Sequence, residues 1–260
     1  MTRILAVANQ KGGVGKTTTA VNVAASLASA NRRVLLVDLD AQGNATMGVG
    51  VDKDDCAVTV RDVLLEACPP KRAIVHLDRL NMDLLPANGD LTEAEVRLRD
   101  QAVGDFALKS ALSELQDDYD YIFLDCPPAL SKLTVNALVA ADGVLVPMQC
   151  EYYALEGLTA LLDTIERIRK VINPSLGIDG LLRTMFDPRN NLANDVSAQL
   201  TQHFGDRVYR TIVPRNVRLA EAPSHGLPAM VYDAQSAGAR AYLALAGELV
   251  RRHGQGRSAA

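Results

Sequence analysis

The sequence lacks the features that would place the chain in a membrane, outside the cell or around a metal cluster. No stretch approaches the ~18 uncharged apolar residues that a membrane span needs. The N-terminus reaches a strand-like pattern almost at once, so we expect no signal peptide. The four cysteines are widely spaced, without a C-x-x-C pair, which argues against zinc and favours reduced thiols. We therefore expect a cytoplasmic protein.

The overall charge gives no sign of a nucleic-acid-binding protein either. A net charge of −4 means that any contact with DNA must come from a local basic patch. Hydrophobic residues make up 48% and charged residues 22%, as in an ordinary globular protein. The 260 residues contain no internal repeat and no Pro- or Ser-rich linker. We predict a single domain over residues 1–253, followed by a frayed tail over 254–260.

Apolar β-branched runs alternate with helical patterns along the chain. Strands are expected at residues 3–9, 33–38, 82–86, 121–125, 143–147, 177–185 and 207–212. Helices are expected at residues 16–30, 91–99, 105–116, 131–140, 154–172, 191–204 and 235–252. Near-continuous apolar strands separated by helices predict an α/β fold, with a doubly wound, mostly parallel sheet covered by helices on both faces.

One glycine-rich segment carries the strongest chemical signal. It reads Lys11-Gly12-Gly13-Val14-Gly15-Lys16-Thr17-Thr18, after an apolar run and before an alanine-rich helical run. A phosphate-binding P-loop needs this strand–loop–helix context. The glycines let backbone N–H groups turn toward the phosphates, and the helix adds its positive end. Lys16 would neutralise the β- and γ-phosphates, and the Thr17 hydroxyl would hold Mg²⁺.

The match to G-x-x-x-x-G-K-[ST] departs from the rule at its start. Gln10 stands where the first glycine belongs, and Lys11 adds a second cation to the loop. The alternative is a glycine-rich turn that only begins a helix. The carboxylates that follow two of the strands favour a nucleotide site instead.

Two aspartates lie where a doubly wound sheet binds its ligands, beyond the carboxyl ends of strands. Asp125 directly follows an apolar strand, which is the place of a Walker B carboxylate acting on Mg²⁺ through its water shell. Asp40 lies two residues beyond Asp38 in a loop with Gly43, and it is our candidate for a magnesium contact and for orienting the attacking water. Each aspartate could also simply cap the next helix. Three such elements in this order favour the functional interpretation.

These segments together resemble the ParA/Soj-type chromosome- or plasmid-partitioning ATPases, of the deviant Walker A class that includes MinD. The matching segments are residues 11–18, 38–44, 125–128, 186–192 and 212–222. The resemblance implies a P-loop fold, ATP and Mg²⁺ as cofactors, and weak intrinsic ATP hydrolysis. It also implies an ATP-dependent face-to-face homodimer that binds double-stranded DNA non-specifically, associates with the nucleoid, and hydrolyses ATP when a ParB-type partner stimulates it.

The resemblance also assigns residues outside the loop. Lys11 would reach across the dimer to the partner's nucleotide. Pro214 and Asn216 would contact the adenine base, although an asparagine there is also a good N-cap for the following helix. Arg189 and Arg218 would bind DNA, although they could equally be solvated surface charges. No operator-binding N-terminal domain is expected, as in the short Soj-like branch.

Three other classes of protein were weighed. A MinD-like membrane-associated positioning ATPase would end in a basic amphipathic helix, whereas residues 251–260 contain glycines and no large apolar residue. An iron–sulfur electron carrier would need ligating cysteines, but Cys126 and Cys150 read as small core residues. A structural or repressor role without hydrolysis is disfavoured because Lys16, Thr17 and both aspartates are present.

Overall fold

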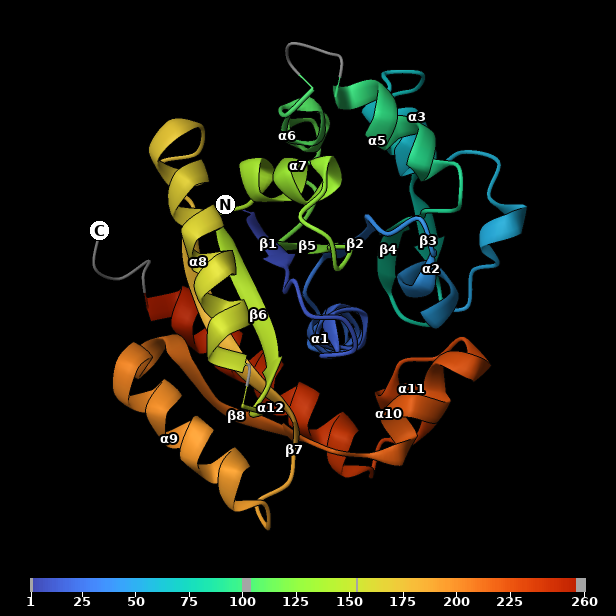
Figure 1. Ribbon diagram of the computed structural model, residues 1–260. Coiled ribbons are helices and arrows are strands. Elements are labelled where there is room, and N and C mark those ends of the chain that lie inside the picture. The colour runs from blue at the N-terminus through green and yellow to red at the C-terminus, as the bar shows by residue number, and fades with distance from the viewer. Residues whose placement is uncertain (1, 100–103, 153, 256–260) are drawn as a thin grey trace.

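Eight strands form one sheet in the order β3-β4-β2-β5-β1-β6-β7-β8 (Figure 1). The computed structural model describes residues 2–99, 104–152 and 154–255. The strands are β1 (Arg3–Val7), β2 (Val34–Asp38), β3 (Val75–Leu77), β4 (Met82–Leu85), β5 (Tyr121–Asp125), β6 (Gly143–Gln149), β7 (Gly177–Phe186) and β8 (Val208–Pro214). Across the described ranges every neighbouring pair is parallel except β3 with β4. The predicted doubly wound, mostly parallel sheet is confirmed.

Helices cover both faces of this sheet. They are α1 (Lys16–Ser29), α2 (Asn44–Gly48), α3 (Val60–Leu64), α4 (Pro70–Ala73), α5 (Leu91–Arg99), α6 (Ala107–Ser113), α7 (Lys132–Ala140), α8 (Ala154–Val171), α9 (Asn191–Phe204), α10 (Val217–Glu221), α11 (Ala229–Tyr232) and α12 (Ala237–Gln255). One face packs against α3 to α9, and the other packs against α1, α2 and α12.

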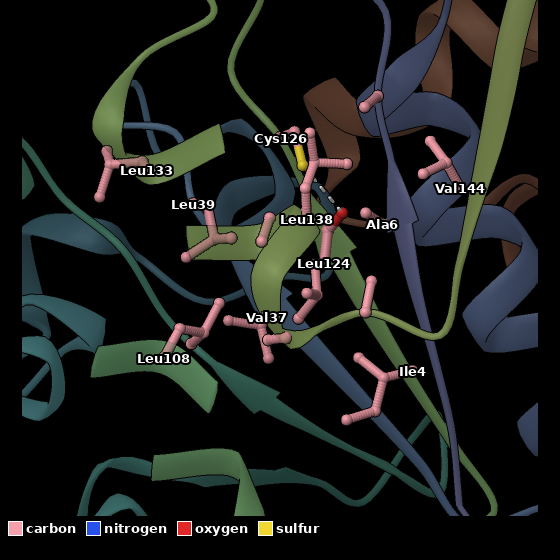
Figure 2. Close-up of a cluster of buried hydrophobic side chains, with 14 of the residues drawn as sticks. Ile4, Ala6, Val37, Leu39, Leu108, Leu124, Cys126, Leu133, Leu138 and Val144 are labelled. Carbon is pink, nitrogen blue, oxygen red and sulfur yellow. Dashed lines mark hydrogen bonds between the residues drawn. The ribbon is translucent and has the colours of Figure 1, made fainter. Parts of the chain in front are cut away.

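The alternation of side chains along a strand divides the core into two layers. In β1, Ile4 and Ala6 join the layer under α7 and α8, while Leu5 and Val7 join the layer under α1 and α12. Figure 2 shows part of the first layer, where the Cys126 side chain lies among aliphatic residues. Cys126 is 1% exposed, as expected for a small core residue.

The register of the central strands brings three functional segments to one edge. In the β1–β5 pair Val7 stands opposite Asp125, and in the β2–β5 pair Asp38 stands opposite the same residue. Since these strands are parallel, all three end together. The loop after β1 therefore lies beside the aspartates that close β2 and β5.

The structure differs from the prediction at several boundaries. β1 ends at Val7 and not at residue 9, because residues 8 and 9 already belong to the glycine-rich loop. The short elements α2, α3, α4, α10, α11 and β3 were missed, since three to five residues are too few to show a period. α12 continues to Gln255, two residues into the expected tail, and the rest of that tail lies outside the described residues.

Candidate nucleotide site

The loop between β1 and α1 presents backbone N–H groups at the start of a 14-residue helix. Gly13 and Gly15 have φ of 74° and 88°, a left-handed conformation that glycine adopts without strain. Gly15 occupies the N-cap position of α1, and in the described part of the chain no side chain caps this helix. The first N–H groups of α1 therefore remain available to an anion.

Two buried side chains hold this loop in place. Asn9 donates from Nδ2 to the carbonyl of Pro147 (2.8 Å), and its Oδ1 accepts from the N–H of Lys11 (3.0 Å). On the other side, the hydroxyl of Thr184 in β7 donates to the carbonyl of Val14 (2.8 Å). The loop is thus fixed by β6 and β7 before any ligand arrives. A preformed cradle binds phosphate without first ordering its own backbone.

Lys16 lies inside the cradle. It is only 7% exposed, and its Nζ donates to the carbonyl of Lys11 at 3.2 Å. Burial lowers the pKa of Lys16, while the nearby Asp125 and Asp40 act in the opposite direction. A buried ammonium with so few partners needs a further anion. A phosphate would supply it.

Asp125 is a buried carboxylate that the Thr17 hydroxyl approaches without forming a hydrogen bond of ordinary geometry. It is 0% exposed, and neither of its oxygens has a hydrogen bond of ordinary geometry among the described residues. Burial and the neighbouring Asp38 raise its pKa well above the usual range, and the nearby Thr17 hydroxyl and Lys16 offset this only in part. Such a group is costly unless it is compensated by a cation or a proton.

Asp38 has a different role from Asp125, because its oxygens are engaged. Oδ1 accepts from the N–H of Asp40 (3.1 Å), and Oδ2 accepts from the N–H and the hydroxyl of Thr46 (both 2.8 Å). Burial nevertheless raises the pKa of Asp38 to about 6. Asp38 thus fixes the loop that carries Asp40, and it has little capacity left to contact water or metal.

Asp40 lies on that loop and is half-buried. Its Oδ1 accepts from the N–H of Gln42 (3.0 Å), which leaves its other oxygen for a ligand. Gly43 closes the loop with φ of 66°, and a Cβ there would come within 2.9 Å of the carbonyl of Ala87. Asp40 is near enough to raise the pKa of both Lys16 and Asp125. The structure therefore brings both predicted catalytic aspartates to Lys16.

These residues fit a magnesium ion that a nucleotide helps to hold. The Thr17 hydroxyl and the Asp40 and Asp125 carboxylates are hard oxygen donors, the type that Mg²⁺ prefers. Among the described residues, no group of three or more His, Cys, Asp or Glu side chains could hold a metal ion alone. Mg²⁺ usually keeps several waters and shares its coordination with substrate phosphates. The unpaired Asp125 is where its charge would be compensated.

A cavity of about 330 Å³ opens beside the loop. Its walls come from the loop and α1, the ends of β7 and β8, α10 and α12, and they include Gly15, Thr18, Met185, Pro214, Asn216 and Tyr242. Both predicted base contacts line it. Asn216 also caps α10, accepting from the N–H of Arg218 at 3.1 Å, so the N-cap interpretation is confirmed and the contact with a base stays a prediction. Its amide nitrogen remains as a donor for a base.

Met185 was not predicted to belong to this cavity. It adopts φ of 49°, which is uncommon for a residue with a side chain. Gln149 at the end of β6 donates from Nε2 to its sulfur (2.6 Å). The apolar strand pattern predicted that Met185 lies near a strand end, but no sequence pattern predicts a left-handed backbone conformation at a methionine.

Lys11 pairs with a carboxylate that lies outside the glycine-rich loop. Its Nζ pairs with Oε2 of Glu151 at 2.5 Å, and the two side chains are 40% and 51% exposed. Glu151 was also missed by the sequence analysis, because 140 residues separate it from Lys11. The extra cation of the loop thus has a partner within its own subunit.

The two candidate DNA-binding arginines are exposed and already paired. Arg189 contacts Asp187 through Nε (2.9 Å) and Nη2 (2.7 Å), and its side chain is 88% exposed. Arg218 pairs with Glu221 (2.7 Å) and with Asp233 (3.3 Å). Either guanidinium would have to exchange these carboxylates for phosphates before it could bind DNA.

The described residues contain no helix that is long and apolar enough to cross a membrane. All four cysteines have raised pKa values, chiefly because of burial, and that of Cys150 reaches about 11. A reactive thiol needs the opposite shift. These cysteines are therefore suited to packing and not to nucleophilic chemistry.

Comparison with known proteins adds to this geometry. The family model described as an AAA domain matches residues 2–178. The chromosome partitioning protein ParA of Myxococcus xanthus is 51% identical over 96% of this chain and 88% of its own length. The chromosome-partitioning ATPase Soj of Thermus thermophilus is also 51% identical, over 96% of each chain.

A solved structure shares the same architecture. It is that of a cobyrinic acid a,c-diamide synthase from Mycobacterium smegmatis with bound ADP and magnesium. It superposes with a TM-score of 0.87 at 42% identity, covering 98% of this chain and 97% of the other. The order of strands and helices is therefore shared with a protein whose structure holds a nucleotide and its metal.

Proposed function

The chain belongs to the ParA/Soj family of chromosome-partitioning ATPases, and from this premise we propose a complete cycle for it. The protein binds Mg·ATP, closes face to face on a second copy, and in that form binds double-stranded DNA without regard to sequence. A ParB-type partner then stimulates hydrolysis and releases the DNA. The cycle would hold the protein on the nucleoid while ATP is bound.

One observation carries the nucleotide part of this proposal. The buried carboxylate of Asp125, which has no hydrogen bond of ordinary geometry among the described residues, lies at the same edge of the sheet as buried Lys16 and the uncapped start of α1. Each of these groups is costly in the free protein. A triphosphate with a divalent cation supplies all the missing charges at once.

The residues divide the chemistry among themselves. The N–H groups of Gly13 to Thr18 and the Lys16 ammonium bind the phosphates, and Lys16 counters the charge that grows on the leaving group. Thr17 and Asp125 hold the magnesium ion and its waters, and Mg²⁺, when bound, neutralises the phosphate oxygens. Asp40 orients the attacking water and accepts its proton. Pro214 and Asn216 select adenine.

Dimerisation is inferred from the second lysine. A single P-loop uses one lysine, and the Lys11 side chain is 40% exposed and pairs with Glu151 outside the loop. A charge at this place fits the γ-phosphate of a facing subunit. Two cations on each triphosphate would offset the repulsion between the facing nucleotides. Lys11→Ala should therefore lose the dimer and stimulated hydrolysis but keep monomeric ATP binding.

DNA binding is inferred for Arg189 and Arg218. Arg189 lies in the loop after β7, and Arg218 lies on α10, which helps to line the base cavity. Closure of the dimer would bring two sets of both arginines onto one composite face. Phosphate attracts arginine more strongly when several of them act together. Their present pairs with carboxylates would then exchange for DNA phosphates.

The name of the Mycobacterium structure suggests an amide-forming synthase as an alternative. If glutamine supplied the nitrogen, such an enzyme would need an activated nucleophile, commonly a cysteine thiolate. All four thiols here have raised pKa values. The two relatives at 51% identity carry partitioning names, whereas the Mycobacterium structure is 42% identical. We therefore favour partitioning.

The decisive experiment measures retention of non-specific DNA with ATP, with ADP and without nucleotide. Retention should require ATP and fall steeply with salt. The slope of the logarithm of the DNA-binding constant against the logarithm of the salt concentration should shrink by about one for each arginine removed per subunit. Arg189→Glu and Arg218→Glu should lose DNA and keep the dimer. Arg169→Glu, which breaks a comparable exposed ion pair on α8, is the matched control.

Two outcomes would contradict the proposal. Unchanged retention in both dimerising variants would move the DNA surface elsewhere. Binding to lipid vesicles instead of DNA would favour the membrane-associated alternative.

A further inference from the structure

Glu151 holds Lys11 by an ion pair that any use of Lys11 in trans must break. We propose that Glu151 is a positioning residue that retains Lys11 within its own subunit and thereby sets the threshold for dimer closure. The inference rests on the proposed function, because it assumes that Lys11 acts on a second copy of this chain. Glu151 thereby gains a role although it lies outside the glycine-rich loop and is not one of the aspartates at the strand ends.

The contacts of Lys11 leave only its side chain free to move. Its N–H donates to Oδ1 of Asn9 (3.0 Å), and its carbonyl accepts from Nζ of Lys16 (3.2 Å). The backbone is therefore fixed on both sides of the residue. The ammonium alone must swing from one anion to another, and the anion it contacts in the monomer is the carboxylate of Glu151 at 2.5 Å.

Glu151 is itself attached to the base cavity. Its N–H donates to the carbonyl of Gln149 (3.0 Å), and Gln149 donates from its side chain to the sulfur of Met185 (2.6 Å). Met185 lines the cavity where the base would lie, and its left-handed φ of 49° keeps it in a sparsely populated conformation. A base that displaces Met185 would act on the segment that carries Glu151. Three contacts thus connect the base cavity to the ammonium of Lys11.

The exposure of the pair limits the strength of this restraint. With side chains 40% and 51% exposed, such an ion pair changes an equilibrium by about two- to fivefold. A symmetric dimer would break two pairs, so the two factors multiply to at most about 25-fold in the dimer dissociation constant. This is enough to shift the protein concentration at which dimers form, and too little to prevent dimers.

The test is Glu151→Gln, which keeps the shape of the side chain and removes its charge. We expect a dimer dissociation constant lowered by about 4- to 25-fold with a non-hydrolysable ATP analogue, measured by sedimentation equilibrium. Nucleotide affinity of the dilute monomer should stay unchanged, and the gain should shrink in high salt because the pair is exposed. Glu166→Gln, which removes a carboxylate paired with Arg169 and Lys170 on α8, should leave the dissociation constant unchanged.

The two single variants separate this inference from the proposed function. If Lys11→Ala dimerises like the parent, the proposed sandwich and the restraint both fail. If Lys11→Ala loses the dimer but Glu151→Gln dimerises no better than the parent, the restraint alone is wrong. A weaker dimer in Glu151→Gln would likewise overturn it.

Discussion

Two buried aspartates at opposite ends of the same sheet have opposite electrostatic environments. Asp125 ends β5 beside the glycine-rich loop; among the described residues it has no hydrogen bond of ordinary geometry, and its pKa is raised well above the usual range. Asp179 lies near the start of β7 and accepts from His253 Nε2 (2.7 Å) and from the Tyr209 hydroxyl. Burial raises the pKa of Asp179, but these partners and Arg3 outweigh it, and the net pKa is lowered.

The same contrast extends to their neighbours. Glu248 of α12, only 6% exposed, accepts from the N–H groups of Arg210 and Thr211 and pairs with Arg252 at 2.7 Å. At this end both carboxylates have partners within the chain, although the Nε of Arg3, which pairs with Asp179 through Nη2, has no hydrogen bond among the described residues. At the carboxyl end Asp38 is satisfied in the same way and Asp125 is not, although both ends belong to one sheet. The difference indicates which end stabilises the fold and which end is kept for a ligand.

The largest effect should come from removing Asp40 at the carboxyl end. Asp40→Ala should lower stimulated hydrolysis by about 10²- to 10⁴-fold, because a water-orienting carboxylate acts mainly in the transition state. ATP binding and the ATP-bound dimer should persist. Steady-state hydrolysis and sedimentation with ATP measure the two separately. Normal turnover would assign the attacking water to another residue. Asp38 would be the next candidate, although its oxygens already accept hydrogen bonds.

Removing Asp179 should instead affect stability. Asp179→Asn removes the buried carboxylate charge that His253 and Arg3 contact. We therefore expect a loss of about 2–4 kcal/mol in the free energy of unfolding. Hydrolysis per folded molecule should be unchanged. Urea denaturation followed by circular dichroism measures the loss. A stable variant with poor hydrolysis would reverse the roles of the two ends.

A third effect tests packing at the amino end without touching charge. A Cβ at Gly180 would come within 2.4 Å of the Tyr209 ring, so Gly180→Ala should cost about 1–3 kcal/mol by overpacking. Gly177→Ala, three residues earlier on β7, meets nothing within 4 Å and is the matched control. Thermal unfolding of both variants should separate them. Equal melting temperatures would mean that Tyr209 moves aside freely.

The smallest effect concerns acid. Because the folded pKa of Asp179 lies below its ordinary value of 3.8, its stabilisation is present above that value and is lost as pH falls through the folded pKa. The parent should therefore lose stability more steeply than Asp179→Asn in acid below about pH 4. Denaturation midpoints across that range provide the measurement. Parallel curves would show that Asp179 is not charged in the folded protein.

The sequence was sufficient for one end of the molecule and not for the other. Lys16, Thr17 and Asp125 follow apolar strands or glycines at a short spacing, so local patterns predicted their meeting place, and the observed strand register places them there. Short-range patterns also gave the longer helices to within three residues at either end. They missed α2 and α10, which are only five residues long.

Contacts between distant segments left no comparable signal. Glu151 meets Lys11 across 140 residues, and Asp179 meets His253 across 74. Met185 adopts its left-handed backbone because of the strands and the loop around it, not because of its residue type. Such side-chain pairings depend on the assembled sheet, and a sequence pattern gives only the strands that make them possible.

Above all, we propose that Asp125 is held uncompensated for a magnesium ion. The stability of Asp125→Asn without ligand, and with ATP in the presence and absence of Mg²⁺, tests it directly. Without ligand we expect no loss and a gain of up to about 1 kcal/mol, because an unpaired buried carboxyl is removed. Mg²⁺ should then add less to the stabilisation by ATP than it does in the parent, because Thr17, Asp40 and the phosphates remain as ligands without Asp125. A ligand-free protein that loses stability as Asp179→Asn does, or one that still responds fully to Mg²⁺, would contradict this account.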